Sequence, residues 1–294
     1  MNAPFGHVLT AMITPFDGEG NVDHGRVWEL AGYLVDNGSD GIVVGGTTGE
    51  APTLSTDEKV ALFRAVVEAV GDRAVVVAGT GTYDTRESIE LTEQAAAAGC
   101  NGAMAVTPYY SRPSQEGLIA HFSAIADATD LPVLLYNIPS RTGRLIEVET
   151  LARLSEHPRI VAVKDAVGDL AFTTRTKVAA GEALAVYSGD DILTLPMMAV
   201  GGVGVVSVAT HLAGRQVAEM VAAALAGDWD RARALHLALA PLFQALFVEP
   251  NPQPVKGGLN AFWEPVGEPR LPLVPAAPDT VAAIGVALEA ARRA

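Results

Sequence analysis

One lysine in this sequence stands where an amine could act as a nucleophile. Lys164 directly follows the apolar run 160–163, so it is expected at the end of a buried strand. Removal from water weakens the hold of a lysine on its proton, and a neutral amine can form an imine with a carbonyl compound. The ordinary alternative is a lysine that reaches the rim or pairs with Asp165. The other lysines lie in charged helical segments or in a loop rich in proline and glycine: Lys59, Lys177 and Lys256.

Side chains that could move protons or hold anions follow other apolar runs. Tyr136 ends the run before that of Lys164, and a phenol beside an amine can relay protons, although a core tyrosine is the alternative. Thr47 and Thr48 lie in a glycine-rich turn, whose backbone N–H groups and hydroxyls suit an anion. Arg141 has a planar guanidinium that suits a carboxylate, unless it forms a surface salt bridge.

Several other chemistries find little support in the sequence. The six histidines have no metal-ligand spacing at the end of an apolar run. The glycine-rich turn 45–50 lacks the lysine of a phosphate-binding loop, and Gly79-Thr80-Gly81 lacks the third glycine of a dinucleotide fingerprint. No Gly-x-Ser-x-Gly elbow is present. These patterns argue against a metal-dependent aldolase, a nucleotide-binding protein and a serine hydrolase.

Short apolar runs rich in Val, Ile and Ala must position these residues. Polar, helix-periodic segments follow most of the runs, and capping-box spacings mark helix starts at Ser55 and Asp84. The pattern predicts an α/β fold, a closed (β/α)8 TIM barrel with its site at the carboxyl ends of the strands. An open doubly wound sheet would usually show a nucleotide loop after its first strand. The predicted strands are Val8–Ile13, Gly41–Val44, Ala74–Ala78, Gly102–Val106, Val133–Tyr136, Ile160–Val163, Leu184–Tyr187 and Val203–Val206.

The alternation of strands and helices stops after the eighth unit. Asp228–Phe247 and Ala277–Arg292 have helical patterns, and a proline-rich join without a strand lies between them. We therefore predict a catalytic barrel over residues 1–226 and a C-terminal helical extension over residues 227–294 that packs on it.

Composition narrows the classes of partner. The 294 residues carry a formal net charge of −14, which argues against nucleic acid and anionic membranes as partners. The uncharged stretch Ile192–Gly214 is interrupted by proline and glycine, so we do not expect a membrane span. The single cysteine favours a reducing compartment, and residues 1–10 lack the pattern of a signal peptide. A cytoplasmic protein is expected.

The motifs at the strand ends resemble a known family. Taken in order, they are similar to those of the dihydrodipicolinate synthase and N-acetylneuraminate lyase superfamily, from near Val8 to about Leu273. Ser140-Arg141-Thr142-Gly143 resembles the synthase branch, in which the arginine binds the carboxylate of aspartate semialdehyde. The matching motifs are Gly46-Thr47-Thr48-Gly49-Glu50, Val106-Thr107-Pro108-Tyr109-Tyr110, Leu135-Tyr136-Asn137-Ile138-Pro139 and Ala162-Val163-Lys164-Asp165.

The resemblance implies a reaction and a role for each matching residue. It implies a lyase that joins pyruvate to L-aspartate 4-semialdehyde, the first committed step of diaminopimelate and lysine synthesis, with neither metal nor organic cofactor. It also implies a homotetramer built from tight dimers. The implied catalytic residues are Lys164, which forms the imine, and Tyr136, which shuttles protons. Thr47 is implied to join Tyr136 to Tyr110, and Tyr110 is implied to reach in from a neighbouring subunit. The implied substrate-binding residues are Thr48 for the pyruvate carboxylate, Arg141 for the second substrate, and Gly189 and Val206 through backbone atoms.

Two other functions remain open at this point. One is another pyruvate-dependent lyase of the superfamily, acting on N-acetylneuraminate or a 2-keto-3-deoxy-sugar acid, against which Arg141 argues. The other is a non-catalytic binding barrel, against which the set of Lys164, Tyr136 and Thr47 argues, since a fold alone does not fix a function.

The resemblance also bears on inhibition by lysine. In lysine-sensitive relatives the inhibitor binds at the dimer interface, and two of its contact positions, Glu87 and Tyr109, match here. Lys59 would place a positive charge beside the ammonium group of the ligand, and Pro52 cannot donate a backbone N–H. We therefore expect weak inhibition or none. The positions that differ are Ala51, Pro52, Thr56, Lys59 and Tyr83.

Overall fold

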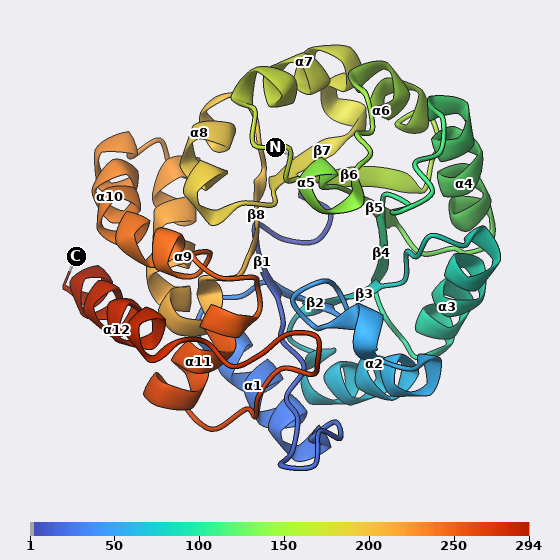
Figure 1. Ribbon diagram of the computed structural model, residues 1–294. Coiled ribbons are helices and arrows are strands. Elements are labelled where there is room, and N and C mark those ends of the chain that lie inside the picture. Colours follow the sequence, from blue (N-terminus) through green and yellow to red (C-terminus); the bar gives the residue numbers. More distant parts are fainter. Residues whose placement is uncertain (1–2, 294) are drawn as a thin grey trace.

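The computed structural model describes residues 3–293 and contains a closed barrel of parallel strands (Figure 1). Each strand pairs with the next in sequence, and β1 also pairs with β8. Nearly every strand residue is buried, because side chains fill the interior and helices cover the outside. The strands are β1 Val8–Ala11, β2 Gly41–Val44, β3 Val75–Gly79, β4 Gly102–Val106, β5 Val133–Asn137, β6 Ile160–Asp165, β7 Ala185–Ser188 and β8 Gly204–Ser207.

This barrel confirms the predicted fold class. The bounds of β2 and β4 agree with the prediction, and the other strands differ by one or two residues at an end. The longest extension is in β6, where the ladder continues through Lys164, which pairs with Tyr136 on β5 and Tyr187 on β7. The lysine therefore belongs to the strand itself, which fixes its backbone.

The helices form a ring around the strands (Figure 1). The predicted capping box at the start of α2 is confirmed, since Ser55 and Glu58 each bond the backbone N–H of the other. At α3 only half of the predicted box forms, because Asp84 caps the helix while Glu87 accepts from Thr82. The helices of the ring are α1 His24–Asp36, α2 Thr56–Val70, α3 Thr85–Ala97, α4 Gln115–Asp127, α6 Val148–Leu154, α7 Leu170–Ala180, α8 Thr194–Ala199 and α9 Thr210–Leu225. The short helix α5 Pro139–Thr142 lies inside this ring, next to β5 and β6 (Figure 1). The 3-10 turns are η1 Ala51–Thr53, η2 Gly181–Ala183 and η3 Asp191–Leu193.

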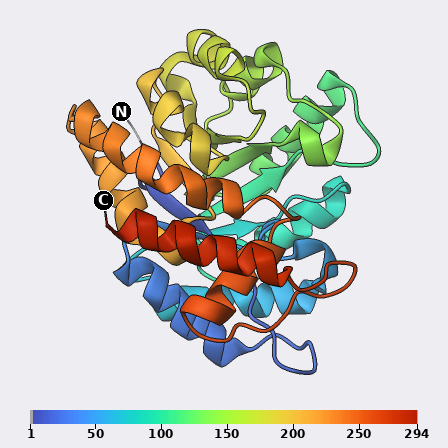
Figure 2. The same ribbon diagram turned by 60° about the vertical axis from the view of Figure 1, so that its left-hand side comes forward.

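Three further helices lie together along one side of the barrel (Figure 2). They are α10 (Trp229–Ala245), α11 (Gln253–Phe262) and α12 (Pro278–Arg292), and α10 packs against both α9 and α12. The join between α10 and α12 contains no strand, as predicted, but the loop predicted around Lys256 is wrong, because α11 lies there. Pro254 is in the first turn of α11, where a missing N–H breaks no helical bond. The division of the chain at residue 226 stays a prediction.

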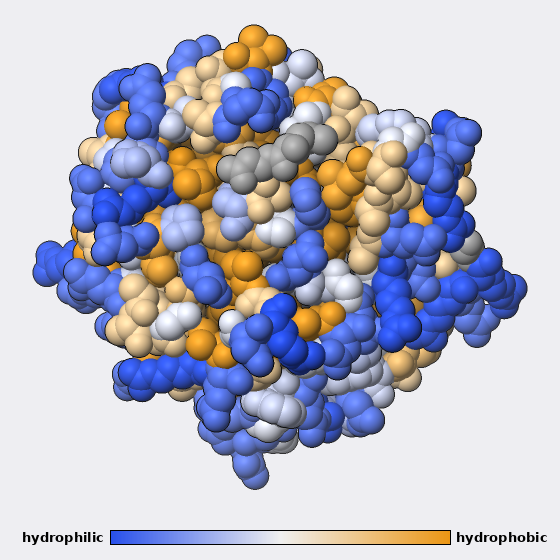
Figure 3. All heavy atoms as spheres, turned by 180° about the vertical axis from the view of Figure 1, so that it is seen from behind, coloured by the Kyte–Doolittle hydropathy of each residue, from blue (hydrophilic) through white to orange (hydrophobic). Residues whose placement is uncertain are grey.

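No helix within residues 3–293 is long and apolar enough to cross a membrane. The uncharged stretch 192–214 is divided among η3, α8, β8 and the start of α9. The face of the barrel opposite that of Figure 1 has a largely hydrophilic rim, and hydrophobic side chains gather nearer its centre (Figure 3).

Candidate active site

Lys164 lies in the barrel interior at the carboxyl end of β6. Its side chain is on the same strand face as that of Ala162, which belongs to the interior core. Only 5% of Lys164 is exposed, and its Nζ lies 4.3 Å from the centroid of the Tyr136 ring. Gly189 packs behind it, since a Cβ at that position would lie 3.1 Å from the Lys164 Cγ. The amine is thus held against the phenol ring in a dry site.

The charge on Lys164 is poorly stabilised. No ion pair of this lysine is found in the described part of the chain, and the carboxylate of Asp165 instead accepts from the Thr173 hydroxyl and a backbone N–H. Burial lowers the pKa of Lys164 to about 8; the negative charge of Asp191 opposes this shift and the positive charge of Arg141 adds to it. Lys164 therefore neither reaches the rim nor pairs with its sequence neighbour, and much of it is neutral near pH 8.

Asp191 is a buried carboxylate near Lys164 that the sequence analysis did not single out. It is 2% exposed and accepts from the backbone N–H groups of Val208 and Ala209, at 3.0 Å each, and from the Ser207 hydroxyl. Burial raises its pKa and these hydrogen bonds oppose that rise. In the sequence Asp191 directly follows Asp190, which caps η3. No local pattern shows which of the two aspartates is the cap and which is the buried carboxylate.

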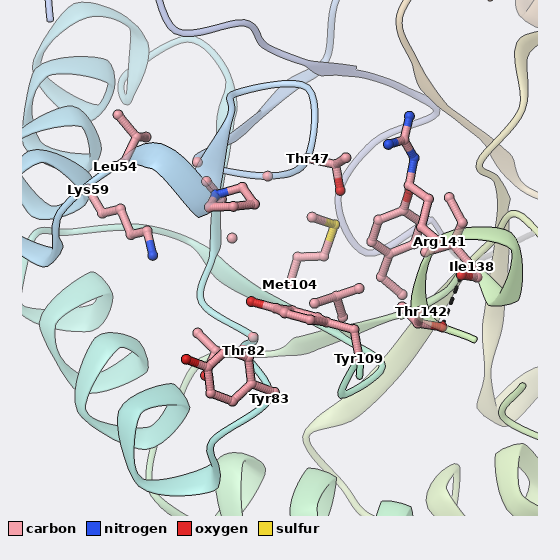
Figure 4. A pocket seen from close by; sticks show the side chains of 18 of the residues that line it. Thr47, Leu54, Lys59, Thr82, Tyr83, Met104, Tyr109, Ile138, Arg141 and Thr142 are labelled. Atoms are coloured by element: carbon pink, nitrogen blue, oxygen red, sulfur yellow. Dashed lines mark hydrogen bonds between the residues drawn. The ribbon is translucent and has the colours of Figure 1, made fainter. Parts of the chain in front are cut away.

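A cavity of about 480 Å³ opens at the strand ends (Figure 4). Thr47, Tyr136 and Arg141 line it, from the turn after β2, from β5 and from α5. Lys164, Thr48 and Val206 are buried and do not belong to the lining, and Val206 belongs to the interior core. The cavity therefore brings together the predicted residues after β2 and β5, and Lys164 joins them through its contact with the Tyr136 ring.

Tyr136 has the properties of a proton donor. It is 4% exposed, and burial raises its pKa to about 12, while the charge of Arg141 and a hydrogen bond from Thr47 act in the opposite direction. Its backbone is fixed as well, because the Thr107 hydroxyl donates to the Tyr136 carbonyl at 3.0 Å. The phenol is thus protonated at neutral pH and lies over the amine of Lys164.

Tyr110 does not enter the site of its own chain. Its neighbour Tyr109 lines the cavity and packs edge-on against Tyr83, with ring centroids 5.2 Å apart. Tyr110 is 95% exposed and its φ is +68°, a left-handed conformation that costs free energy for a residue with a Cβ. The loop after β4 therefore holds this aromatic ring outward.

Two polar residues after α10, Asn251 before α11 and Lys256 on α11, reach the turn that carries Thr47 and Thr48. The Nδ2 of Asn251 donates to the Thr48 hydroxyl at 2.9 Å. Lys256 forms a 2.6 Å ion pair with Glu50, and both side chains are at most 1% exposed. The sequence analysis placed Lys256 in an irregular loop, which is incorrect, because it lies on α11 and is fully buried. Neither long-range contact has a local sequence signal.

Residues 3–293 contain no group of three or more His, Cys, Asp or Glu side chains placed to hold a metal ion. The chemistry available from the residues present is that of a desolvated amine held against a protonated phenol, with that phenol and an arginine lining one cavity. Fold and site together define a (β/α)8-barrel lyase of the imine-forming class.

Comparison with known proteins places the chain within that class. The chain belongs to the dihydrodipicolinate synthetase family, whose sequence profile matches residues 4–291. It is 55% identical over 285 residues to a 4-hydroxy-tetrahydrodipicolinate synthase of Moorella thermoacetica, covering 97% of this chain and 98% of that one.

Solved structures agree with this assignment. A dihydrodipicolinate synthase of Bacillus anthracis superposes with a TM-score of 0.94 at 49% identity, covering 97% of this chain and 98% of the other. The enzyme of Cyanidioschyzon merolae, solved with lysine bound, gives a TM-score of 0.96 at 44% identity and covers 99% of both chains.

Proposed function

We propose that this chain condenses pyruvate with L-aspartate 4-semialdehyde through an imine on Lys164. This is the reaction of a 4-hydroxy-tetrahydrodipicolinate synthase, the name that close relatives over nearly the full length carry. The observation that carries the mechanism is the buried amine of Lys164, with a lowered pKa and a phenol 4.3 Å away. The chain is accordingly a lyase of diaminopimelate and lysine synthesis.

The first steps use Lys164 and Tyr136. The neutral amine attacks the C2 carbonyl of pyruvate, and the carbinolamine loses water to give a protonated imine. Tyr136 lies close enough to donate a proton to the departing hydroxyl, which leaves as water. The resulting phenolate takes a proton from C3, and the electron pair of that C–H bond moves toward the cationic nitrogen to give the enamine.

The later steps need the second substrate. The enamine C3 attacks the aldehyde carbon, and the new alkoxide takes a proton. The α-amino group of the semialdehyde portion then attacks C2, closes the ring and displaces the Lys164 amine. In this assignment Thr48 holds the pyruvate carboxylate, Arg141 holds that of the semialdehyde, and Gly189 and Val206 contribute backbone atoms.

The proposal extends to the assembly. We assign Tyr110 to the site of a neighbouring subunit, where with Thr47 and Tyr136 it completes a proton relay in a homotetramer built from tight dimers. Its outward orientation and left-handed backbone support this role, since both are costly in an isolated chain. The single cysteine, Cys100, is buried, and burial raises the pKa of its thiol to about 12. Such a thiol is inert, and we place the enzyme in the cytoplasm.

Reductive trapping tests the mechanism. Borohydride added with pyruvate should fix a covalent adduct on Lys164, which peptide mass spectrometry would locate. Lys164→Ala should abolish trapping. An adduct on another lysine, or no adduct on the wild-type chain, contradicts the proposal; the buried Lys256 is an internal control for a lysine removed from water.

A coupled assay with pyruvate and L-aspartate 4-semialdehyde tests the substrate. A panel that adds N-acetylmannosamine and sugar-derived aldehydes covers the other lyases of the superfamily. Turnover of a sugar aldehyde in preference to the semialdehyde would favour the sugar-acid lyase function.

A further inference from the structure

The turn that carries Thr47 and Thr48 is held by residues about 200 positions further along the chain. Asn251 bonds Thr48, Lys256 pairs with Glu50, and the backbone N–H of Arg270 donates to the other carboxylate oxygen of Glu50 at 2.8 Å. From the barrel itself, the Thr14 hydroxyl donates to the carbonyl of Gly49 at 2.6 Å. The turn 45–50 is thus fixed mainly by the C-terminal segment 251–270, with one further bond from the loop after β1.

The contact between Asn251 and Thr48 determines whether the Thr48 hydroxyl acts as a donor or an acceptor toward other groups. A hydroxyl has one donor hydrogen and can accept through its lone pairs. Because the Thr48 oxygen accepts from Nδ2 of Asn251, its own hydrogen remains available for an acceptor elsewhere. A bound carboxylate is such an acceptor and has no hydrogen to offer in return. Thr48 is therefore prepared to donate to an anion.

Asn251 is an unusual residue for such a buried place. It is 6% exposed, and its Oδ1 has no hydrogen-bond partner within the described residues. A buried acceptor without a partner lowers the stability of the fold. The presence of Asn251 here is therefore not explained by a contribution to stability. Within residues 3–293 its side chain hydrogen-bonds to Thr48 alone, which indicates that orienting Thr48 is what the residue contributes.

Glu50 shows that the turn is also held against strain. Its φ is +57°, a left-handed conformation disfavoured for a residue with a Cβ, and it directly precedes η1. Lys256 supplies the opposing charge at 2.6 Å, and the Lys256 Nζ also lies 4.0 Å from the centroid of the Phe16 ring. These contacts over-determine the backbone on which Thr48 is mounted.

From this arrangement we infer that Asn251 is a positioning residue for binding of the pyruvate carboxylate, acting through Thr48. The ion pair of Glu50 with Lys256 fixes the turn on which that action depends. The inference rests on the proposed function, and it makes α11 and the segment before it part of the substrate site.

A double-mutant cycle tests the inference. Asn251→Ala, Thr48→Val and the double variant would be compared by the pyruvate concentration that gives half-maximal borohydride trapping on Lys164. We expect Asn251→Ala to raise that concentration about five- to tenfold, as for the loss of one hydrogen bond. The double variant should be no worse than Thr48→Val, because Asn251 acts only through that hydroxyl. The KM for the semialdehyde should not change.

Asn260→Ala is the matched control. Asn260 lies on α11, its side chain bonds Gly267 and Val266, and it does not contact the turn. This variant should lose thermal stability without changing the half-saturating pyruvate concentration. If Asn251→Ala fails to fold, Asn251→Asp replaces it; aspartate has the same size but can only accept, so it should weaken pyruvate binding further.

Four results separate the outcomes. Additive effects of Asn251→Ala and Thr48→Val overturn the inference, and so does a half-saturation like that of Asn260→Ala. Absence of trapping on Lys164 in the wild-type chain instead contradicts the proposed function. Intact trapping with non-additive loss of pyruvate affinity supports both.

Discussion

At the scale of single residues, burial sets the reactivity of the site. Lys164 and Tyr136 are both removed from water, and burial favours the neutral form of each. It lowers the pKa of the amine to about 8 and raises the pKa of the phenol to about 12. A neutral amine next to a protonated phenol is the pair that imine formation needs. Asp191 moderates the effect on Lys164, because its negative charge favours the ammonium form.

The pKa of Lys164 predicts a pH dependence. Because the folded pKa is lowered to about 8, half of the amine is neutral at that pH and most of it is neutral about one unit higher. The rate of adduct formation at fixed, low pyruvate should therefore rise from pH 6, with a midpoint at about pH 8 and a plateau above about pH 9. Asp191→Asn should move the midpoint to lower pH, since it removes the charge that favours the ammonium form. A midpoint that stays in place would contradict the assigned influence of Asp191.

Arg141 predicts a split between the two substrates. Arg141→Ala should leave trapping of pyruvate nearly intact and reduce kcat/KM for the semialdehyde about 10- to 150-fold, equivalent to about 1.5–3 kcal/mol for a hydrogen bond to a charged group. We expect no larger loss because Arg141 is exposed in the single chain. Arg153→Ala, which removes a surface ion pair with Glu116, is the control. Equal damage to both substrates would show that Arg141 is structural.

At the scale of elements, the errors of the sequence analysis have physical causes. The strands were predictable because buried runs of Val, Ile and Ala are long enough to stand out. α1 was omitted although Val27, Leu30, Ala31 and Leu34 recur with helical spacing and are all buried. α11 was hidden because Pro254 and two glycines suggested an irregular loop.

The site was predictable to the extent that its residues follow strands. Lys164, Tyr136, Thr47 and Arg141 each come at or just after a strand end, so their convergence followed from the barrel. Asn251 and Lys256 come from outside that rule, and their partners are about 200 residues away. No local pattern marks such contacts, and only the packed chain shows them.

The elements after β2 and β3 predict the response to lysine. Pro52, Lys59, Tyr83 and Glu87 all line the same cavity as Arg141, and Figure 4 shows the Lys59 side chain reaching into it. Burial lowers the pKa of Lys59 and Glu87 opposes that shift. A cationic group there would repel the ammonium of a bound lysine.

We therefore expect weak inhibition by lysine or none. Activity would be measured at saturating pyruvate with lysine raised to millimolar levels, and Lys59→Ala should increase the inhibition. Lys177→Ala, which alters a lysine on α7 far from the cavity wall, is the control. Half-inhibition of the wild-type chain below roughly 1 mM, or about −4 kcal/mol of binding, would contradict the prediction.

At the scale of the whole molecule, the proposed role of Tyr110 predicts that each active site contains residues from two subunits. Tyr110→Phe and Lys164→Ala chains should each be inactive or strongly impaired alone. After the two are dissociated and reassembled together, hybrids should regain part of the activity, because one site of each tight dimer then has both groups intact. Mass photometry would give the assembly size. A fully active monomer at the assay concentration would rule the arrangement out.

The net charge of −14 sets a further condition on the whole molecule. Both proposed substrates are anions, so the overall field opposes their approach. Arg141 and the donors of the turn 45–50 are the groups that would offset this field locally, and the turn is the part that long-range contacts hold in place.

The long-range contacts that hold the turn 45–50 have a consequence for synthesis of the protein on the ribosome. Thr48 and Asn251 are 203 positions apart. At about 5–20 residues per second, a ribosome needs roughly 10–40 s to pass from one to the other. By the end of that interval all eight strands have been synthesised, but Lys256, the ion-pair partner of Glu50, has not. All eight strands are thus synthesised before the residues that fix the proposed pyruvate-binding turn, and a chain that ended after β8 would lack those residues.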